Sequence, residues 1–532
     1  EEVLGVKRVG ITDNFFNMGG DSILSIQVIF KINKGDVAIR VKDIFDYPTI
    51  KLLIENIELK KRKKYDRYNQ DIISISGRVP LAPIQRWFFD QKFSNYNHYN
   101  QAVLLTPNVV LKEKLLLQLM DSIVKHHDVL RMRYMQEQER WFQEYANVEK
   151  YIYRYEDLTN LSEDCLESKA EEIANEVQES LNIVKGPLIG MVLYQCGSNK
   201  QRLLLVMHHL IIDGVSWRIL IEALEDGYNQ LLLNSNIALK SKTCSYKKWQ
   251  ERLGKYAESE LLKEEIDYWN NITRRTIQLF ARDERNKKQV SINKSILTLS
   301  KEATNSLLKD IPKILNTGIN DILITALMLA LNEWKGIREI VIYLEGHGRE
   351  ELFDDIDISR TVGWFTSMFP VYLKISDPVD INRSISEIKK LLRGVPNKGI
   401  GYGILRYLSG DNRLEKHREI DIVFNYLGQW NVSLKEKIFN YASTTSVGRC
   451  VGKNNISESV LNINCEIRNK RFISVVDYKS SFFGTKQNKK GLCEYFHDSL
   501  YLIINHCKSN FEDTDFSLIT NDDVKLINDA FN

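Results

Sequence analysis

Met207-His208-His209-Leu210-Ile211-Ile212-Asp213-Gly214 is the stretch that decides the fold, because it joins two different hydrophobic patterns. The apolar run 203–206 before it predicts a buried strand. In 216–232, after it, large apolar residues recur at helical spacing, which predicts a helix. The two histidines therefore lie at a strand end, where neighbouring side chains point to opposite faces. We expect a single working histidine here, since two imidazoles on opposite faces do not share one metal ion.

The composition is that of a large folded protein without a strong charge bias. The chain has 532 residues, of which 43% are hydrophobic and 27% charged, and its net charge is +3. This length allows roughly three or four domains, and the balanced charge gives no reason to expect nucleic acid or an acidic membrane as a partner. The seven cysteines contain no C-x-x-C pair, so reduced thiols in a cytoplasmic protein are the simplest interpretation. No N-terminal signal pattern is present, and the apolar run 322–331 is too short to cross a bilayer.

The N-terminal region predicts a helix that begins at a serine. Ile23, Ile26 and Phe30 recur on one helical face directly after Ser22. A serine at this position is a common N-cap. A phosphate ester on the same serine would meet the positive end of the helix and its free N–H groups. Gly20 and its neighbouring glycine allow a tight backbone that leaves the hydroxyl accessible, so both interpretations stay open.

The segment 13–22, Asp-x-Phe-Phe-x-Met-Gly-Gly-Asp-Ser, resembles the peptidyl carrier (thiolation) domain of nonribosomal peptide synthetases. The resemblance implies a small all-α, four-helix domain over residues 1–59, with 4′-phosphopantetheine on Ser22 that holds an aminoacyl or peptidyl thioester. Asp21, next to Gly20, matches a variant common in carriers that feed epimerisation domains. Residues 1–5 are similar to the end of the carrier's first helix, so we expect the domain to be N-terminally truncated.

Strands and helices mix through the rest of the chain, which predicts an α/β (α+β) class. The polar, basic stretch 60–73 predicts an interdomain linker. We expect an N-terminal lobe over 74–275, a C-terminal lobe over 276–520, and a tail or linker over 521–532. The predicted strands are 103–105, 131–134, 141–145, 189–196, 292–300, 339–344, 461–468 and 471–478, and the predicted helices are 110–127, 162–181, 301–315 and 320–334.

From about residue 81 to residue 515 the chain resembles the epimerisation domain of nonribosomal peptide synthetases, a member of the condensation superfamily. Four groups of residues carry this resemblance: the opening 80–88, the histidine motif 208–218, the loop Glu-Gly-His-Gly-Arg-Glu at 345–350, and the segments that begin at Gly399 and Phe424. The resemblance implies two chloramphenicol-acetyltransferase-like lobes in a V-shaped pseudo-dimer. It also implies a tunnel between the lobes, which the carrier's arm enters.

Two candidate catalytic groups follow from the chemistry. Inversion of an α-carbon needs one proton removed from one face and another delivered to the opposite face, so two proton-handling groups are the natural solution. His209 is the first candidate, because a neutral imidazole has a pKa of roughly 6.5. Glu345 is the second, provided that burial at a strand end raises its pKa. The resemblance assigns both positions as catalytic, and leaves open which one removes the proton.

The neighbouring residues have supporting roles. We expect Asp213 to brace the histidine loop through a buried pair with Arg349 of the other lobe. His208 is expected to pack on the opposite strand face. Asn425 and Tyr426 are expected to position the thioester or its enolate. The remaining interpretations are a lining or structural role for His347, core packing for Trp364 and Tyr402, and no metal site, because no set of histidines has metal-ligand spacing.

The sequence therefore predicts a carrier–epimerase pair that converts L to D at the α-carbon of a pantetheine-bound residue. An amide-forming condensation enzyme and a non-catalytic scaffold for carriers are the two alternatives. The partners expected are the protein's own carrier with its tethered substrate, an upstream adenylation domain and a downstream condensation domain. Neither nucleic acid nor a membrane is expected.

Overall fold

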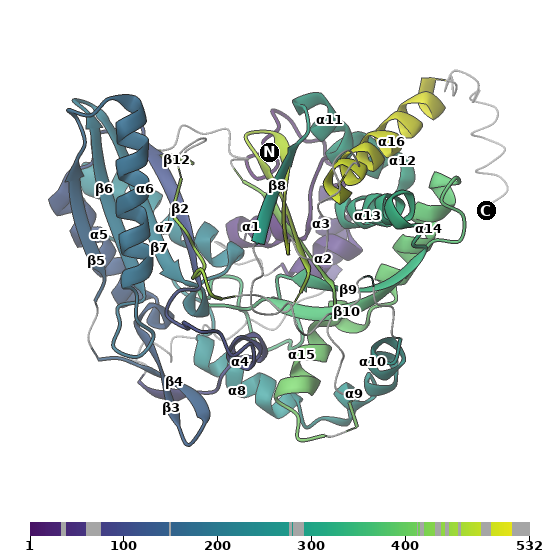
Figure 1. Ribbon diagram of the computed structural model, residues 1–532, viewed down its shortest axis with the longest axis horizontal. Helices are drawn as coiled ribbons and strands as arrows, with labels where there is room; N and C mark the ends of the chain where they lie inside the picture. The colour runs from purple at the N-terminus through teal and green to yellow at the C-terminus, as the bar shows by residue number, and fades with distance from the viewer. Residues whose placement is uncertain are drawn as a thin grey trace.

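The computed structural model describes most of the chain, and its architecture is α/β (Figure 1). The described residues are 1–32, 39–59, 76–147, 150–275, 279, 292–411, 413–414, 420–430, 438–441, 446–455, 459–479 and 491–512. The expected linker 60–73 and tail 521–532 lie outside these ranges. Within them, no single helix is both long and apolar enough to cross a membrane, although one helix pair bent by 100°, Lys301–Leu315 and Ile319–Lys335, passes that test jointly.

The first lobe is built on a five-stranded sheet with helices on both faces. Its strand order is β12-β2-β7-β6-β5, and only β5 and β6 are parallel. Successive residues of these strands point to opposite faces of the sheet. One face packs on α6, and the other on α5 and α7. The elements are β2 (Asn100–Pro107), β5 (Ile152–Asp157), β6 (Ile189–Gly197), β7 (Lys200–His208), β12 (Phe439–Tyr441), α5 (Glu113–His126), α6 (Glu163–Ser180) and α7 (Gly214–Leu232).

A hairpin and several short helices follow, of which the last two pack on the second lobe. A separate three-stranded sheet has the order β1-β4-β3, and includes the hairpin expected from the sequence. The elements are β1 (Gly77–Val79), α4 (Pro83–Asp90), η1 (Asp128–Arg131), β3 (Met132–Glu137), β4 (Arg140–Tyr145), η2 (His209–Ile211), α8 (Tyr246–Tyr256), α9 (Glu260–Lys263) and α10 (Ile266–Thr273).

The second lobe carries a six-stranded mixed sheet. Its strand order is β10-β9-β11-β13-β14-β8, with β11 parallel to both β9 and β13. Eleven residues of α13, from Asp321 to Leu331, are buried, so this helix is core rather than surface. The elements are β8 (Ile292–Thr298), α11 (Lys301–Asn305), η4 (Ser306–Asp310), α12 (Ile311–Leu315), α13 (Ile319–Lys335), β9 (Glu339–Gly346), β10 (Ser367–Lys374), α14 (Ile381–Arg393), η5 (Pro396–Gly399), α15 (Ile400–Tyr407), β11 (Ile422–Gln429), β13 (Leu461–Arg468), β14 (Arg471–Lys479) and α16 (Leu492–Glu512).

The second half of the chain also reaches back into the first sheet. Strand β12 pairs with β2, and Tyr99 forms an isolated bridge with Val451. The first sheet is therefore completed by a strand from the second half of the chain. This crossing strand joins the lobes through backbone hydrogen bonds.

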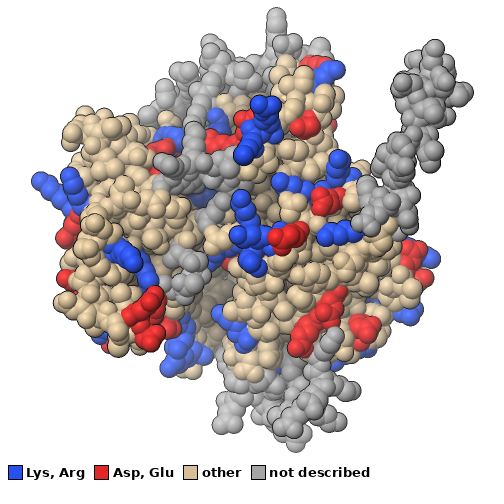
Figure 2. Space-filling model, turned by 90° about the horizontal axis from the view of Figure 1, so that it is seen from above, with Lys and Arg blue, Asp and Glu red and all other residues tan. Residues whose placement is uncertain are grey.

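The carrier region contains three described helices, α1 (Ser22–Ile32), α2 (Val41–Asp46) and α3 (Ile50–Leu59). In Figure 1 these purple helices lie between the two lobes. Ile23 and Ile26 of α1 form an apolar cluster with Val215 of α7, so the carrier is packed on the larger domain. On the face drawn in Figure 2, basic and acidic side chains are interspersed over the described surface.

Candidate active site

His209 is held in one orientation by bonds on both ring nitrogens. Its Nδ1 lies 2.9 Å from the carbonyl oxygen of Ile212, and its Nε2 lies 2.8 Å from the side-chain nitrogen of Gln101. The indole N–H of Trp217 donates to the Gln101 oxygen at 2.9 Å, which directs the Gln101 amide N–H toward the imidazole. Nδ1 therefore carries the proton, and Nε2 keeps the lone pair of a general base. Burial lowers the pKa of His209, so the ring is neutral near pH 7.

The two adjacent histidines separate for a reason that the alternation of strand residues did not capture. His208 is the last residue of β7, whereas His209 already belongs to the 3-10 turn η2. His208 is fully buried, lies 2.8 Å from the carbonyl oxygen of Tyr96, and has a pKa lowered by burial to about 3. It is a neutral core residue. Opposite strand faces were expected to divide the pair, whereas a turn divides it.

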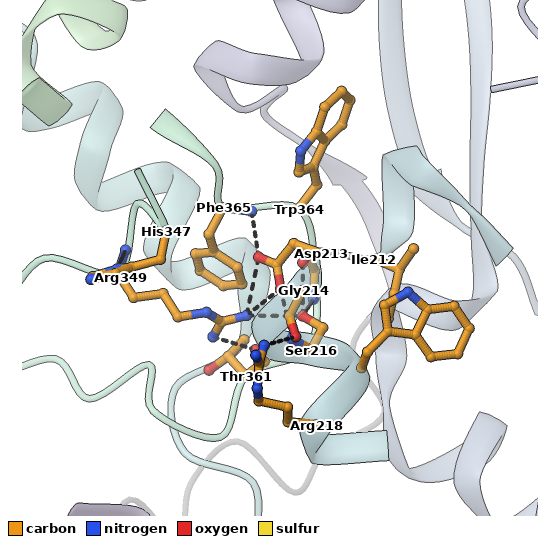
Figure 3. Close-up of polar contacts among 12 residues, drawn as sticks. Ile212, Asp213, Gly214, Ser216, Arg218, His347, Arg349, Thr361, Trp364 and Phe365 are labelled. Carbon is orange, nitrogen blue, oxygen red and sulfur yellow. Dashed lines mark hydrogen bonds and ion pairs between the residues drawn. The ribbon is translucent and has the colours of Figure 1, made fainter. Parts of the chain in front are cut away.

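Asp213 and Arg349 meet between the lobes, as the sequence predicted (Figure 3). Asp213 caps α7 by accepting the Ser216 backbone N–H at 2.6 Å, and it also accepts the Phe365 N–H at 3.0 Å. Nη2 of Arg349 lies 3.3 Å from both Asp213 oxygens and 2.9 Å from the Ser216 hydroxyl. Both side chains are almost fully buried. This ion pair fastens the loop that follows Glu345 to the loop that follows His209.

In the loop that follows Glu345, the backbone leaves no room for a side chain at Gly348. Its φ is +65°, and an added Cβ would lie 1.7 Å from the carbonyl oxygen of Phe365. His347, one residue before, accepts the Arg349 backbone N–H at 3.0 Å, and burial lowers its pKa. His347 therefore helps to shape the loop.

Glu345 lies on β9, opposite Met368 of β10. The Asn425 side-chain N–H donates to its carboxylate at 2.8 Å, which is the position expected of Asn425 beside the site. Burial raises the pKa of Glu345 to about 7. The carboxyl group is therefore close to half protonated at neutral pH, and is able to give or take a proton.

Two aromatic side chains pack on His209, and sequence reasoning missed both as site residues. Tyr99 stacks on His209 with ring centroids 5.6 Å apart. Burial raises the pKa of Tyr99, and the charge of Glu345 raises it further. Trp364 lies 4.2 Å from His209, centroid to centroid. Trp364 is buried, as the packing interpretation expected, but the ring that it packs against is the candidate base. The only sequence signal for Trp364 was its position after Gly363, which does not identify a partner in a distant part of the chain.

The carrier serine occupies the N-terminus of α1. Asp21 caps this helix by accepting the Leu24 N–H at 2.8 Å, while Ser22 is partly exposed. An added Cβ at Gly20 would lie 2.4 Å from the Phe15 ring, so the close turn before Ser22 requires glycine. The first turn of the helix is therefore compact and its serine accessible, which fits a covalently attached phosphate ester.

Strand β11 links this serine region to Glu345. Gln429 at its end donates to the carbonyl oxygen of Gly19 at 2.8 Å, and an added Cβ at Gly428 would lie 2.9 Å from Ile23. Asn425 on the same strand contacts Glu345. Asn425 and Gly428 are three residues apart, which corresponds to about 10 Å along a strand. The attachment helix and the candidate carboxyl group thus lie along one strand.

Tyr426, which was expected together with Asn425 to position the thioester or its enolate, lies on the carrier side of the strand. Its hydroxyl lies 3.5 Å from Asp21, and burial raises the pKa of that aspartate. Successive residues of a strand point to opposite faces, so the side chains of Asn425 and Tyr426 point away from each other. Arg218 donates to the carbonyl oxygens of Leu427 and Gln429 at 2.9 and 3.3 Å and stabilises the carboxylate of Asp21. Tyr426 therefore contacts the carrier.

A second contact joins the carrier to the loop after Arg349. The Val41 N–H, at the start of α2, donates to Glu351 at 2.6 Å. Arg40 forms an ion pair with Asp354 at 2.5 Å and lies 4.0 Å from Glu351. The segment that follows Glu345 therefore also contacts the carrier.

Comparisons with known proteins agree with this geometry. Residues 75–523 match the family model of the condensation domain, and residues 1–57 match that of the phosphopantetheine attachment site. Gramicidin S synthase 1 of Brevibacillus brevis is 38% identical over 97% of this chain and 47% of its own length. Bacitracin synthase 3 of Bacillus licheniformis is 34% identical over 99% of this chain and 8% of its own. The chain thus spans less than half the length of these relatives.

Among solved structures, the epimerization domain from the third module of tyrocidine synthetase B, TycB3(E), superposes with a TM-score of 0.75. It is 33% identical, and the match covers 82% of this chain and 98% of that one. The first condensation domain of the CDA synthetase shares the fold, with a TM-score of 0.61 at 16% identity, 81% of this chain and 96% of that one. The carrier match implies a covalently attached 4′-phosphopantetheine. The chain belongs to the condensation-domain family of nonribosomal peptide synthetases, as a carrier domain followed by a domain that resembles their epimerization domains.

Proposed function

We propose that the protein epimerises the α-carbon of an aminoacyl or peptidyl group held as a thioester on the phosphopantetheine arm of Ser22. One observation carries the proposal. A neutral imidazole, His209, and a carboxyl group with a pKa of about 7, Glu345, come from different lobes, and the charge of Glu345 acts on the Tyr99 ring that stacks on His209. Amide formation needs one base or positioning group, whereas inversion needs two groups that handle protons.

The thioester makes the α-proton acidic, because its carbonyl oxygen takes up the negative charge that develops at the α-carbon. One of the two side chains accepts this proton from one face. The other side chain donates a proton from the opposite face. The first side chain therefore ends with one proton more and the second with one proton fewer. In the reverse reaction the roles of His209 and Glu345 are interchanged by microscopic reversibility. The pKa of about 7 suits Glu345 to both roles near neutral pH.

Two further groups prepare this exchange. Gln101 holds the lone pair of His209 until substrate replaces its amide N–H. The Asp213–Arg349 pair holds the loops of the two lobes against each other. Neither group exchanges a proton with substrate in this scheme; both are positioning residues.

The wider setting follows from the same proposal. The upstream partner is an adenylation domain that loads the carrier, and the downstream partner is a condensation domain that consumes the D-configured thioester. Both act on the arm of Ser22, and we place the protein in the cytoplasm.

The test is hydrogen exchange on the loaded full-length chain in D₂O. Ser22 is loaded with an L-aminoacyl pantetheine, and α-deuteration and chirality are followed by mass spectrometry and chiral chromatography. Epimerisation predicts deuterium incorporation and a mixed L/D pool. A condensation enzyme predicts a longer product with a second loaded carrier and no exchange, and a scaffold predicts neither.

Two variants and two matched controls locate the chemistry. We expect His209→Ala and Glu345→Gln each to abolish the formation of the opposite configuration. His497→Ala, on α16, and Glu339→Gln, at the exposed end of β9, remove the same groups elsewhere and should leave the rate unchanged. Full activity in either site variant would contradict the assignment.

A further inference from the structure

Lys398 contacts the carrier from a turn of the second lobe that has no role in the mechanism above. Its ammonium group lies 4.5 Å from the centroid of the Phe45 ring, on α2 of the carrier. The negative face of an aromatic ring attracts such a cation. The Phe45 ring also packs on Phe16, with centroids 4.8 Å apart, and is 38% exposed. The ring that Lys398 covers is therefore oriented by the carrier itself.

The backbone around Lys398 is held in a conformation that is unfavourable for residues with a side chain. Asn397 and Lys398 both have a positive φ, at +43° and +51°. Glu265, which is 6% exposed, accepts the Asn397 side-chain N–H at 2.7 Å. Strained turns persist only where the surrounding structure enforces them, and they cluster at functional sites. These contacts involve no carrier residue, so the turn is fixed from within the larger domain.

Lys398 is also tied to the loop that follows Glu345. Its Nζ lies 3.2 Å from one carboxylate oxygen of Glu350, whose side chain is 13% exposed. The other oxygen of Glu350 lies 3.5 Å from Nε2 of His347. Because Nδ1 of His347 accepts the Arg349 backbone N–H, Nε2 carries the proton and faces the carboxylate. One connected set of contacts therefore runs from the carrier ring to the loop beside the candidate carboxyl group.

The contact with the ring is more selective than the charge pairs on the same helix. Arg40 pairs with Asp354, whose side chain is 92% exposed. Exposed ion pairs contribute little, and any carrier with a basic residue at this place would satisfy this one. A cation held over an aromatic face distinguishes that ring from an aliphatic side chain of similar size, which has no negative face.

We propose that Lys398 is a recognition residue for the carrier: it selects carriers with an aromatic side chain at the position of Phe45 and holds them against the loop that follows Glu345. The inference rests on the proposed epimerisation and adds the feature by which that reaction's carrier is recognised. A contact of this kind at a partly exposed site changes a docking equilibrium by about two- to fivefold. Lys398 does not contact the reacting atoms in this scheme and is a positioning residue.

The test measures docking directly, in the full chain that carries the phosphopantetheine arm but no aminoacyl group. Val41 is the first residue of α2, so its N–H has no partner within the helix, and it donates to Glu351 at 2.6 Å. Hydrogen exchange of this single amide, resolved by fragmentation mass spectrometry, therefore reports the undocked fraction. We expect Lys398→Met to speed this exchange by about two- to fivefold, and Lys398→Arg, which keeps the cation, to leave it at the native rate.

Variants of the ring test the same contact from the carrier. Phe45→Leu should speed the exchange as Lys398→Met does, and Phe45→Tyr should not. The double variant Lys398→Met/Phe45→Leu should exchange no faster than either single variant, because both changes remove one contact. Effects that multiply in the double variant would overturn the inference. The Ser25 amide, which donates to the carbonyl oxygen of Asp21 within the carrier, is followed to detect unfolding. If it also exchanges faster in Phe45→Leu, the Lys398 variants alone decide the question.

Lys374→Met is the matched control. The Lys374 side chain is 58% exposed, against 56% for Lys398, and it also pairs with a glutamate, Glu339, at the end of β9 opposite to Glu345. This variant should leave the Val41 exchange unchanged. A native rate in Lys398→Met would overturn the inference. The native chain loaded with an L-aminoacyl group is assayed in parallel for α-deuteration in D₂O. Its absence would contradict the proposed function and leave the docking result standing.

Discussion

The raised pKa of Glu345 makes a prediction about stability that is separate from catalysis. A carboxyl group with a pKa of 4.5 when unfolded and about 7 when folded differs by about 2.5 units, or roughly 3 kcal/mol at 1.36 kcal/mol per unit. Below pH 4.5 the group is protonated in both states and contributes no difference. Between pH 4.5 and 7 only the unfolded state releases the proton, so this residue makes the protein less stable as pH rises. Above pH 7 the full cost is present.

Glu345→Gln removes that cost and keeps the shape of the side chain. The Gln oxygen still accepts the Asn425 N–H that is 2.8 Å from the carboxylate in the native protein. We therefore expect the variant to exceed the stability of the native protein by less than about 1 kcal/mol at pH 5 and by about 3 kcal/mol at pH 8.5. The assay is the denaturant midpoint and the thermal midpoint of both proteins, measured at half-unit steps from pH 5 to pH 8.5.

The control is Glu339, whose pKa is shifted in the direction opposite to that of Glu345. Glu339 lies on the same strand, and its hydrogen bond with Tyr372 lowers its pKa. Its contribution is present above pH 4.5 and is lost as pH falls, so Glu339→Gln should be no more stable than the native protein at pH 8.5. A Glu345→Gln variant whose difference from the native protein does not change between pH 5 and pH 8.5 would refute the reasoning from burial.

Three further predictions concern the positioning groups. Arg349→Met leaves the buried Asp213 carboxylate without its cation and should cost about 3–5 kcal/mol, read from denaturant midpoints; an unchanged midpoint would contradict the bracing role. Gln101→Glu places a carboxylate at the Nε2 of His209 and should raise the pKa of the imidazole by about one unit or more, which moves the acidic limb of the pH–rate profile upward; an unmoved limb would disprove this contact. Arg40→Glu reverses the charge that faces the loop after Arg349, and should lower the exchange rate by up to about fivefold at low salt and less at high salt; a loss that does not depend on salt would count against an electrostatic contact.

Comparison of the patterns with the structure shows which inferences local periodicity supports. The β7–α7 unit, the hairpin of β3 and β4, and the helix that starts at Ser22 were predicted within a few residues. Each of these elements depends on residues that are close in the chain. The Asp213–Arg349 pair joins residues 136 positions apart, which local periodicity does not relate.

The sequence by itself determined which chemical groups are available: a serine shortly after two glycines, a histidine directly after a predicted strand, and a carboxyl group beside two glycines. Only the tertiary structure decided their state and their company. Burial, not residue type, brings the pKa of Glu345 to about 7. Packing between lobes brings Trp364 and Tyr99 onto His209. The pairing of β12 with β2 and the turn of Tyr426 toward Asp21 likewise depend on segments hundreds of residues apart. The physical reason is that desolvation and contact are properties of the assembled interior, and hydrophobic periodicity records only the face that each segment buries, not what it is buried against.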